Sequence, residues 1–211
     1  MLNTPTLEAD SKRKRLPAEE RKREIVSAVV ELAGRNGPDA ITTQAIADKV
    51  GITQGALFRH FADKQAIWIH VFDWVSEQLD QVVGNALAAG GDPLIVLERV
   101  FISHVDFVSR HPGVPRILFH ELQRPADSLF HRSVRTMIGN YRQRIHDVLR
   151  QAKTSGHLPR TLNEEGATVL FIGTIQGLVM QSALFRNETE MLATARRLFP
   201  LILFGLKGTP Q

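Results

Sequence analysis

Several side chains between positions 43 and 64 are of the types that read and hold double-stranded DNA. The amide of Gln54 can donate and accept hydrogen bonds at an adenine edge, and the small residues Gly55 and Ala56 let the backbone approach a groove floor. The cations of Arg59 and Lys64 suit phosphate groups, which position a protein on DNA. The predicted DNA-binding set is Thr43, Gln44, Gln54, Gly55, Ala56, Phe58, Arg59, His60 and Lys64.

The charge of the chain is concentrated near the same end. The formal net charge is +4, and residues 11–23 alone hold seven Lys or Arg and two Glu, so the remainder is close to neutral. If the partner is nucleic acid, a basic arm over residues 1–16 can reach an adjacent minor groove or the backbone. A solvated tail without a partner is the alternative for such a run.

Two short helices joined at Gly51 would position the candidate DNA-binding side chains. Ile46 and Val50 are four residues apart, as are Leu57 and Phe61, so each pair lies on one helical face and points to a shared core. Glycine suits the tight turn because it adopts positive φ without strain. The pattern predicts a helix-turn-helix whose second helix, from Thr53 to about Phe61, reads the DNA. The alternative is an ordinary pair of packed helices.

Other chemistries find little support in the sequence. The chain has no cysteine, which excludes disulfides, cysteine-ligated metals and thiol catalysis. His120-Glu121 does not begin the zinc motif H-E-x-x-H, because position 124 is Arg. No nucleophile elbow, phosphate loop or dinucleotide fingerprint is present, so we expect neither an enzyme nor a cofactor or metal. The apolar stretch at 198–206 is far shorter than the ~20 residues of a membrane span. We therefore expect no membrane partner and a cytoplasmic, nucleoid-associated protein.

The periodicity of the whole chain is helical. The 43% of apolar residues suffices for a packed core, and after the glycine-rich break at 90–93 helical patterns run over roughly 93–110, 115–123, 127–155, 164–187 and 189–206. The predicted fold is all-α with about nine helices. A flexible basic arm at 1–16 precedes a three-helix DNA-binding domain at 17–64. A helical bundle over 65–211 then follows.

The stretch from residue 20 to 68 resembles the DNA-binding domain of TetR/AcrR-type transcriptional regulators. The resemblance rests on Gly37, on T-T-Q-A-I-A at 42–47, on V-G-I-T-Q-G-A-L-F-R-H-F at 50–61 and on D-K at 63–64, without gaps. It implies that Thr43 and Lys64 contact phosphates with His60 near them, and that Gln44 and residues 54–56 approach bases. At position 58 the family usually has a tyrosine whose hydroxyl binds phosphate. Phe58 has no hydroxyl and cannot make this hydrogen bond. It can still pack on a sugar or a thymine methyl.

The resemblance also implies a dimer and an effector pocket in the bundle. A helix-turn-helix reader needs two-fold symmetry to reach two half-sites, which favours pairing of the last two helices over a purely monomeric core. The predicted dimer interface is Leu170, Gly173, Gly177, Gln181, Leu198 and Ile202. The predicted pocket is Phe101, His104, Phe107, Phe119, Met137, Gln176 and Met180. Plain core packing is the alternative for each pocket residue.

These observations predict a ligand-responsive repressor. A homodimer would bind a near-palindromic operator in double-stranded DNA and release it when a small apolar effector enters the bundle. Two alternatives remain open. One is a protein of the same fold with a chromosome-organising or division-linked role, and the other is a small-molecule binder that has lost DNA binding.

Overall fold

The described part of the chain is helical throughout. The computed structural model describes residues 16–123, 129–185 and 187–208, and these form nine α-helices and two short 3₁₀ helices without strands, as predicted. The helices are α1 Ala18–Asn36, α2 Thr43–Val50, α3 Gln54–Leu57, α4 Lys64–Ala88, α5 Pro93–Arg110, α6 Gly113–Glu121, α7 Leu129–Thr154, α8 Glu164–Phe185 and α9 Met191–Lys207. The 3₁₀ helices are Pro38–Ala40 and Glu188–Glu190. Apart from Leu16, the predicted basic arm lies outside the described residues.

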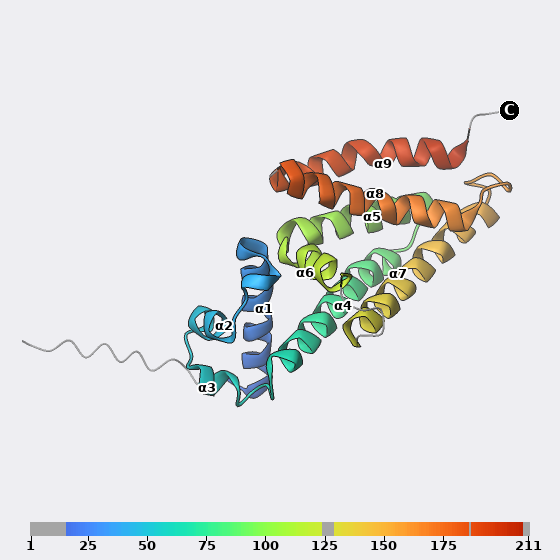
Figure 1. The fold of residues 1–211 in the computed structure, drawn as a ribbon. Coiled ribbons are helices and arrows are strands. Elements are labelled where there is room, and N and C mark those ends of the chain that lie inside the picture. Colours follow the sequence, from blue (N-terminus) through green and yellow to red (C-terminus); the bar gives the residue numbers. More distant parts are fainter. Residues whose placement is uncertain (1–15, 124–128, 186, 209–211) are drawn as a thin grey trace, which may run out of the picture.

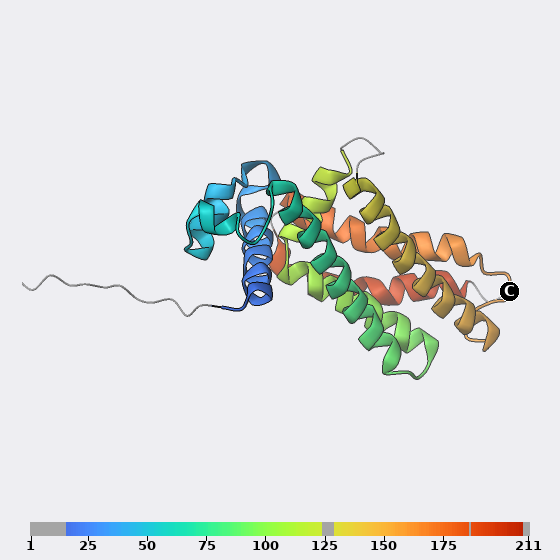
Figure 2. The same ribbon diagram turned by 90° about the horizontal axis from the view of Figure 1, so that it is seen from below.

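The helices form two groups that α4 connects. Helices α1, α2 and α3 lie together at one end of the molecule, and α4 runs from them into the bundle of α5 to α9 (Figure 1). The view from below shows α1 crossing the end of this bundle (Figure 2). Helix α1 packs against α2, α4 and α6, so the small helical group rests directly on the large one.

Local capping explains where the N-terminal helices begin and end. The side-chain oxygens of Thr42, Thr53 and Asp63 accept hydrogen bonds from the backbone N–H groups three residues later, at the starts of α2, α3 and α4. Gly51 ends α2 in the left-handed conformation with φ of 72°, as its place in the turn predicts. Helix α3 is shorter than predicted because regular α-helix ends at Leu57 and turns continue towards Phe61.

The centre of the bundle is aromatic and aliphatic. The Phe101 ring on α5 packs edge-on against Phe171 of α8 at 5.4 Å between ring centroids, and in a tilted arrangement against Phe199 of α9 at 5.5 Å. All three side chains are buried, so α5 lies at the centre of the bundle with α8 and α9 on one side. This packing holds α5 and α8 in place, and other faces of these two helices line the cavity described below.

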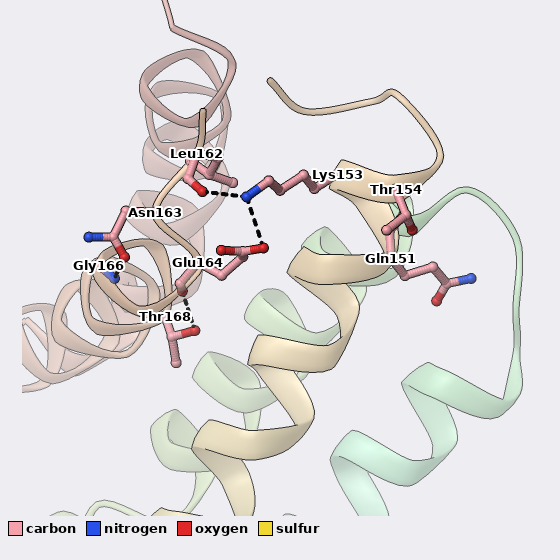
Figure 3. A network of polar contacts seen from close by, with 8 residues as sticks. All are labelled: Gln151, Lys153, Thr154, Leu162, Asn163, Glu164, Gly166 and Thr168. Atoms are coloured by element: carbon pink, nitrogen blue, oxygen red, sulfur yellow. Dashed lines mark hydrogen bonds and ion pairs between the residues drawn. The ribbon is translucent and has the colours of Figure 1, made fainter. Parts of the chain in front are cut away.

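A polar network fixes the turn between α7 and α8 (Figure 3). The ammonium of Lys153 donates to the carbonyl of Leu162 at 2.9 Å and pairs with the carboxylate of Glu164 at 3.0 Å. The side chain of Asn163 accepts from the N–H of Gly166 and so caps α8. Both α7 and α8 line the cavity. The contacts at this turn therefore help to fix the orientation of the two helices relative to each other.

Candidate DNA interface and ligand cavity

The predicted DNA-binding residues lie on three neighbouring N-terminal helices and in the turns that follow α3. Thr43 and Gln44 begin α2, residues 54–56 lie in α3, residues 58–60 lie in the turns after it, and Lys64 is the first residue of α4. All nine side chains are exposed or half-buried. The ring of Phe58 is 42% exposed, although it is apolar. Helices α2, α3 and α4 and the turns after α3 thus expose the predicted DNA-binding residues to solvent.

Two of the predicted base-reading side chains are held by hydrogen bonds within the protein. The amide nitrogen of Gln54 donates to the hydroxyl of Thr43 at 2.5 Å, which links α3 to the start of α2. Gln44 donates to the carboxylate of Asp48 at 2.7 Å, one turn along α2. The amide oxygen of Gln54 is left to accept a hydrogen bond from the exocyclic amine of adenine or cytosine.

The Gln54→Ala variant should relax base preference at one operator position and cost ~1–3 kcal/mol on the preferred sequence, because a specific base contact is lost. Binding measured across a set of single-base operator variants checks this. Gln151→Ala removes an exposed glutamine from α7 and should leave the preference unchanged. An equal loss of affinity on every sequence would contradict the role of Gln54 as a reader.

Two cations among the predicted DNA-binding residues are available for phosphates. Among the described residues, Arg59 and Lys64 have no ion-pair partner, whereas Lys49 pairs with Glu31 at 2.8 Å. Lys64 follows the cap residue Asp63, in the first turn of α4, where free backbone N–H groups also favour an anion. The arrangement suits non-specific contact with the DNA backbone.

The Lys64→Ala variant should weaken binding to all DNA sequences to a similar degree and reduce the salt dependence of log K by about one unit, because one phosphate contact is lost. Affinity titrations at several salt concentrations measure the slope. Lys207→Ala, which removes an exposed lysine at the end of α9, is the matched control and should keep the original slope. An unchanged slope for Lys64→Ala would place this lysine away from the DNA.

A cavity of about 320 Å³ lies in the bundle between α4, α5, α6, α7 and α8. Five of the seven predicted pocket residues line it, namely His104, Phe107, Phe119, Met137 and Gln176. Most other lining side chains are aliphatic, from Val75 and Leu79 on α4 to Ile172, Ile175 and Val179 on α8. The size and the lining are those of a small-molecule site.

Two of the predicted pocket residues lie elsewhere. Phe101 is fully buried in the aromatic core on the α8–α9 side of α5, and Met180 is 53% exposed on α8. Neither side chain lines this cavity. Helices α5 and α8 are apolar on several faces, so periodicity cannot tell a cavity face from a core or surface face. Sequence reasoning also missed Tyr141, the single tyrosine of the chain. Its spacing of four from Met137 and Ile145, both buried on α7, is the signal that places it on the inner face.

A histidine and a tyrosine form one polar part of the cavity wall, to which His131, Arg135 and Gln176 also contribute. Nδ1 of His104 on α5 lies 2.9 Å from the hydroxyl of Tyr141 on α7, and the two rings meet edge to face. Burial lowers the pKa of His104 to about 4 and raises that of Tyr141 above its usual range. Both groups are therefore uncharged near neutral pH.

The lowered pKa of His104 predicts a loss of stability in acid. Because the folded chain resists this protonation, the unfolded chain binds the extra proton between pH 6.5 and about 4. Stability is thus full above pH 6.5 and falls through this window by up to ~1.4 kcal/mol per pH unit from this residue. Thermal unfolding at fixed protein concentration should show a smaller drop from pH 7 to 5 for His104→Gln than for the wild type. An identical drop for His104→Gln and the wild type would contradict the assignment.

Helix α6 joins the cavity to the DNA-binding helices. Val114, Pro115, Leu118 and Phe119 of α6 line the cavity. At its N-terminus, Gly113 lies so close to α1 that an added Cβ would come within 1.9 Å of the Val30 carbonyl oxygen. A change in the cavity that moves α6 must therefore move α1 or break this packing.

Polar contacts reinforce the junction between α6 and α1. The guanidinium of Arg116 donates to the carbonyl of Gly34 on α1 at 2.5 Å. Nδ1 of His120 lies 3.5 Å from a carboxylate oxygen of Asp39, in the 3₁₀ helix that follows α1. These contacts connect α6 along its length to α1 and to the 3₁₀ helix after it, and α1 in turn packs against α2.

The outer face of α8 and α9 is apolar and open to solvent. Leu170, Met180 and Leu184 on α8 and Leu201 and Phe204 on α9 are all at least 47% exposed. By length and composition, α8 is apolar enough to cross a membrane, yet it packs against α5, α7 and α9 within the bundle. A large exposed apolar patch marks an interaction site.

The predicted dimer residues divide between this face and the protomer core. Gly173, Gly177 and Gln181 accompany Leu170 on the open side of α8, and a Cβ added at either glycine would meet nothing within 4 Å. Leu198 is half-buried, and Ile202 is only 6% exposed because it packs inward from α9. The exposed large apolar side chains of α9 are instead Leu201 and Phe204, which lie one residue before and two residues after Ile202.

Comparisons with known proteins agree with this arrangement. Residues 25–71 match the domain family described as bacterial regulatory proteins, tetR family, and residues 124–199 match the family described as tetracyclin repressor-like, C-terminal domain. The nucleoid occlusion factor SlmA of Vibrio cholerae serotype O1 is 25% identical over 177 residues, which cover 83% of this chain and 89% of that protein. A protein named as probable acrEF/envCD operon repressor of Escherichia coli K12 is 22% identical over 175 residues, covering 80% of this chain and 79% of that protein.

A solved structure supports the fold over nearly the full chain. The transcriptional regulator FadR from Bacillus subtilis, in complex with stearoyl-CoA, superposes with a TM-score of 0.72 at 20% identity, covering 87% of this chain and 98% of that one. The N-terminal and C-terminal domains of one regulator family are thus matched in the same order as in that family. The chain belongs to the TetR family of DNA-binding transcriptional regulators.

Proposed function

We propose that this TetR-family regulator is a ligand-responsive repressor that releases a near-palindromic operator when a small apolar effector binds the cavity. The observation that carries the proposal is the position of α6, which lines the cavity with four side chains and packs its glycine start against α1. Residues 17–64 would act as the DNA-binding unit, and residues 65–211 as the effector-binding and dimerisation unit. Such a protein works on the nucleoid in the cytoplasm.

The DNA-binding part of the proposal rests on the surface around α3. Direct readout would come from Gln44, Gln54, Gly55 and Ala56, and phosphate contacts from Thr43, Arg59, His60 and Lys64. Phe58 would pack on a sugar or a thymine methyl. Two such surfaces must reach adjacent major grooves, ~34–36 Å apart, which requires a dimer.

The dimer would form through the open apolar face of α8 and α9. Its centre would be Gly173 and Gly177, where the partner helix can approach closely, surrounded by Leu170, Gln181 and Leu184. Leu201 and Phe204 would cover the α9 side. This pairing buries the apolar surface that a lone protomer exposes.

Effector release follows from linkage between the two sites. The effector must bind the DNA-free conformation more tightly, and a tenfold loss of operator affinity requires ~1.4 kcal/mol of coupling. Movement of α6 on filling the cavity would reach α1 through Gly113, Arg116 and His120. The two reader helices of the dimer would then be held at a spacing that no longer fits the operator.

A chromosome-organising or division-linked role is the second candidate, favoured by the similarity to a nucleoid occlusion factor over 83% of this chain. The two functions differ in how many DNA sites the protein occupies. A repressor of this kind binds one or a few promoters, whereas a chromosome-organising protein binds many dispersed sites.

Capture of sheared genomic DNA from the source organism on the purified protein, followed by sequencing, tests the proposal. One or a few enriched sites sharing an inverted repeat would support a local regulator. Dozens of scattered sites would support the chromosome-organising role. No enrichment even at low salt would contradict DNA binding and leave the cavity as the functional site.

A further inference from the structure

We infer that the cavity takes an uncharged ligand with an apolar body and one hydroxyl or carbonyl oxygen, which hydrogen-bonds to the His104–Tyr141 pair. The inference rests on the proposed function, in which this cavity is the effector site. It adds the chemical class of the ligand, which follows from the groups that line the cavity.

The body of the ligand is set by the size and lining of the cavity. Its volume of about 320 Å³ is at the small end of ligand pockets, which run from ~300 to 1,000 Å³. Aliphatic and aromatic side chains from five helices form most of the wall, and no carboxylate among the described residues lines it. A compact apolar molecule fits this enclosure, and a cationic one finds no counter-ion there.

His131, Arg135 and Gln176 also line the cavity, the last two exposed to solvent. We derive the polar group of the ligand from the hydrogen-bonding capacity of the His104–Tyr141 pair, which joins two walls of the cavity. In the described part of the chain, the only hydrogen bond of either side chain is the one that joins them, at 2.9 Å. A neutral imidazole and a phenol together carry two donors, and their mutual bond uses one of them. In either histidine tautomer, one N–H or O–H donor and at least one acceptor remain for a third group. A single hydroxyl or carbonyl oxygen satisfies that donor.

A charged ligand group is disfavoured at the same place. The surroundings of His104 already shift its pKa towards the neutral form, so they disfavour any unpaired charge beside it. The one Arg or Lys side chain among the described lining residues is Arg135, and it is exposed to solvent. Exposed ion pairs stabilise little because water screens them. Arg135 is therefore a weak anchor for an anionic ligand compared with the inner pair.

Calorimetric titration of the full-length protein without DNA, at about pH 7.5, tests the ligand class with three probes of one chain length. These are 1-octanol, octanoate and octylamine, which differ in the charge of the terminal group. We expect the dissociation constant of 1-octanol to be roughly tenfold lower than those of the two charged probes, because neither charge is compensated inside the cavity. Octanoate binding as tightly as 1-octanol, equal binding of all three, or no binding of any would each overturn the inference.

A pair of variants tests the role of the hydroxyl. Tyr141→Phe should weaken 1-octanol binding roughly three- to tenfold, because one hydrogen bond is lost. Thr136→Val removes an exposed hydroxyl from the same helix, outside this cavity, and should bind as the wild type does. If Tyr141→Phe fails to fold, the ranking of probes on the wild type still decides. If octanoate binds tightly to the wild type and Arg135→Gln abolishes this binding, the cavity has an anion site at Arg135, and the inference is overturned.

The same probes separate this inference from the proposed function. If 1-octanol is preferred in calorimetry but does not release a captured operator fragment, the ligand class stands and the repressor mechanism fails. If octanoate binds preferentially and releases the operator, the mechanism stands and the ligand class fails.

Discussion

The Gly113→Ala variant is expected to lose about 3 kcal/mol of stability or more, at the upper end of the range for overpacked sites. The added methyl carbon would lie 1.9 Å from the carbonyl oxygen of Val30 and 2.9 Å from the backbone nitrogen of Gly34. Both neighbours are backbone atoms of α1, so they cannot rotate away as a flexible side chain would. The methyl group must push α6 away from α1, and the thermal unfolding midpoint should fall.

Gly139→Ala is the matched control for this substitution. Gly139 is an exposed glycine within α7, and a Cβ added there meets nothing within 4 Å. Alanine at such a helical site should stabilise the chain by ~0.5–1 kcal/mol. Thermal unfolding of both variants at one protein concentration makes the comparison. If Gly113→Ala unfolds at the wild-type temperature, α6 does not pack against α1 as closely as described. The proposed coupling of the cavity to the DNA-binding helices through α6 would then fail as well.

The importance of Gly113 could not be predicted from the sequence, because close approach of two helices is a tertiary property. Features that depend on local contacts, such as helix starts and tight turns, can be predicted from the sequence. Thr53 and Asp63 cap helices and Gly51 forms the predicted turn, because each acts on atoms a few residues away. The pairing of Gly34 with Gly113 joins positions 79 residues apart and leaves no mark on the local pattern of either segment.

The cavity was predictable only in part, for a related reason. Helical periodicity identifies an apolar face when the opposite face is polar, as on α7, where the inner positions Met137 and Tyr141 follow at a spacing of four. Helix α8 is apolar nearly all round, so the pattern cannot distinguish its core face, its cavity face and its open face. Met180 was assigned to the cavity and lies on the open side, whereas Gln176, one turn earlier, does line the cavity.

The exposed apolar face of α8 and α9 leads to a further prediction, which concerns the formation of the dimer. Replacing both Leu201 and Phe204 by aspartate should convert the proposed dimer into a monomer, because each side chain is about two-thirds exposed in the protomer and would be covered by the second copy in the proposed dimer. Aspartate at these positions costs little in the free protomer, where water solvates it, but puts unpaired carboxylates into the paired face. The folded chain should therefore survive while the pairing does not.

Sedimentation equilibrium should show the mass falling from twice the chain mass to 23.6 kDa, with helical content retained by circular dichroism. Operator affinity should fall roughly a hundredfold or more, since one reader domain on a half-site lacks the effective concentration that a dimer provides. Ile95→Asp is the control, because Ile95 is an equally apolar side chain on α5 that is 54% exposed and lies on neither α8 nor α9. It should leave mass and affinity unchanged. A double variant that remains dimeric would place the interface elsewhere, and the two reader surfaces would then need a different geometry to meet a palindromic operator.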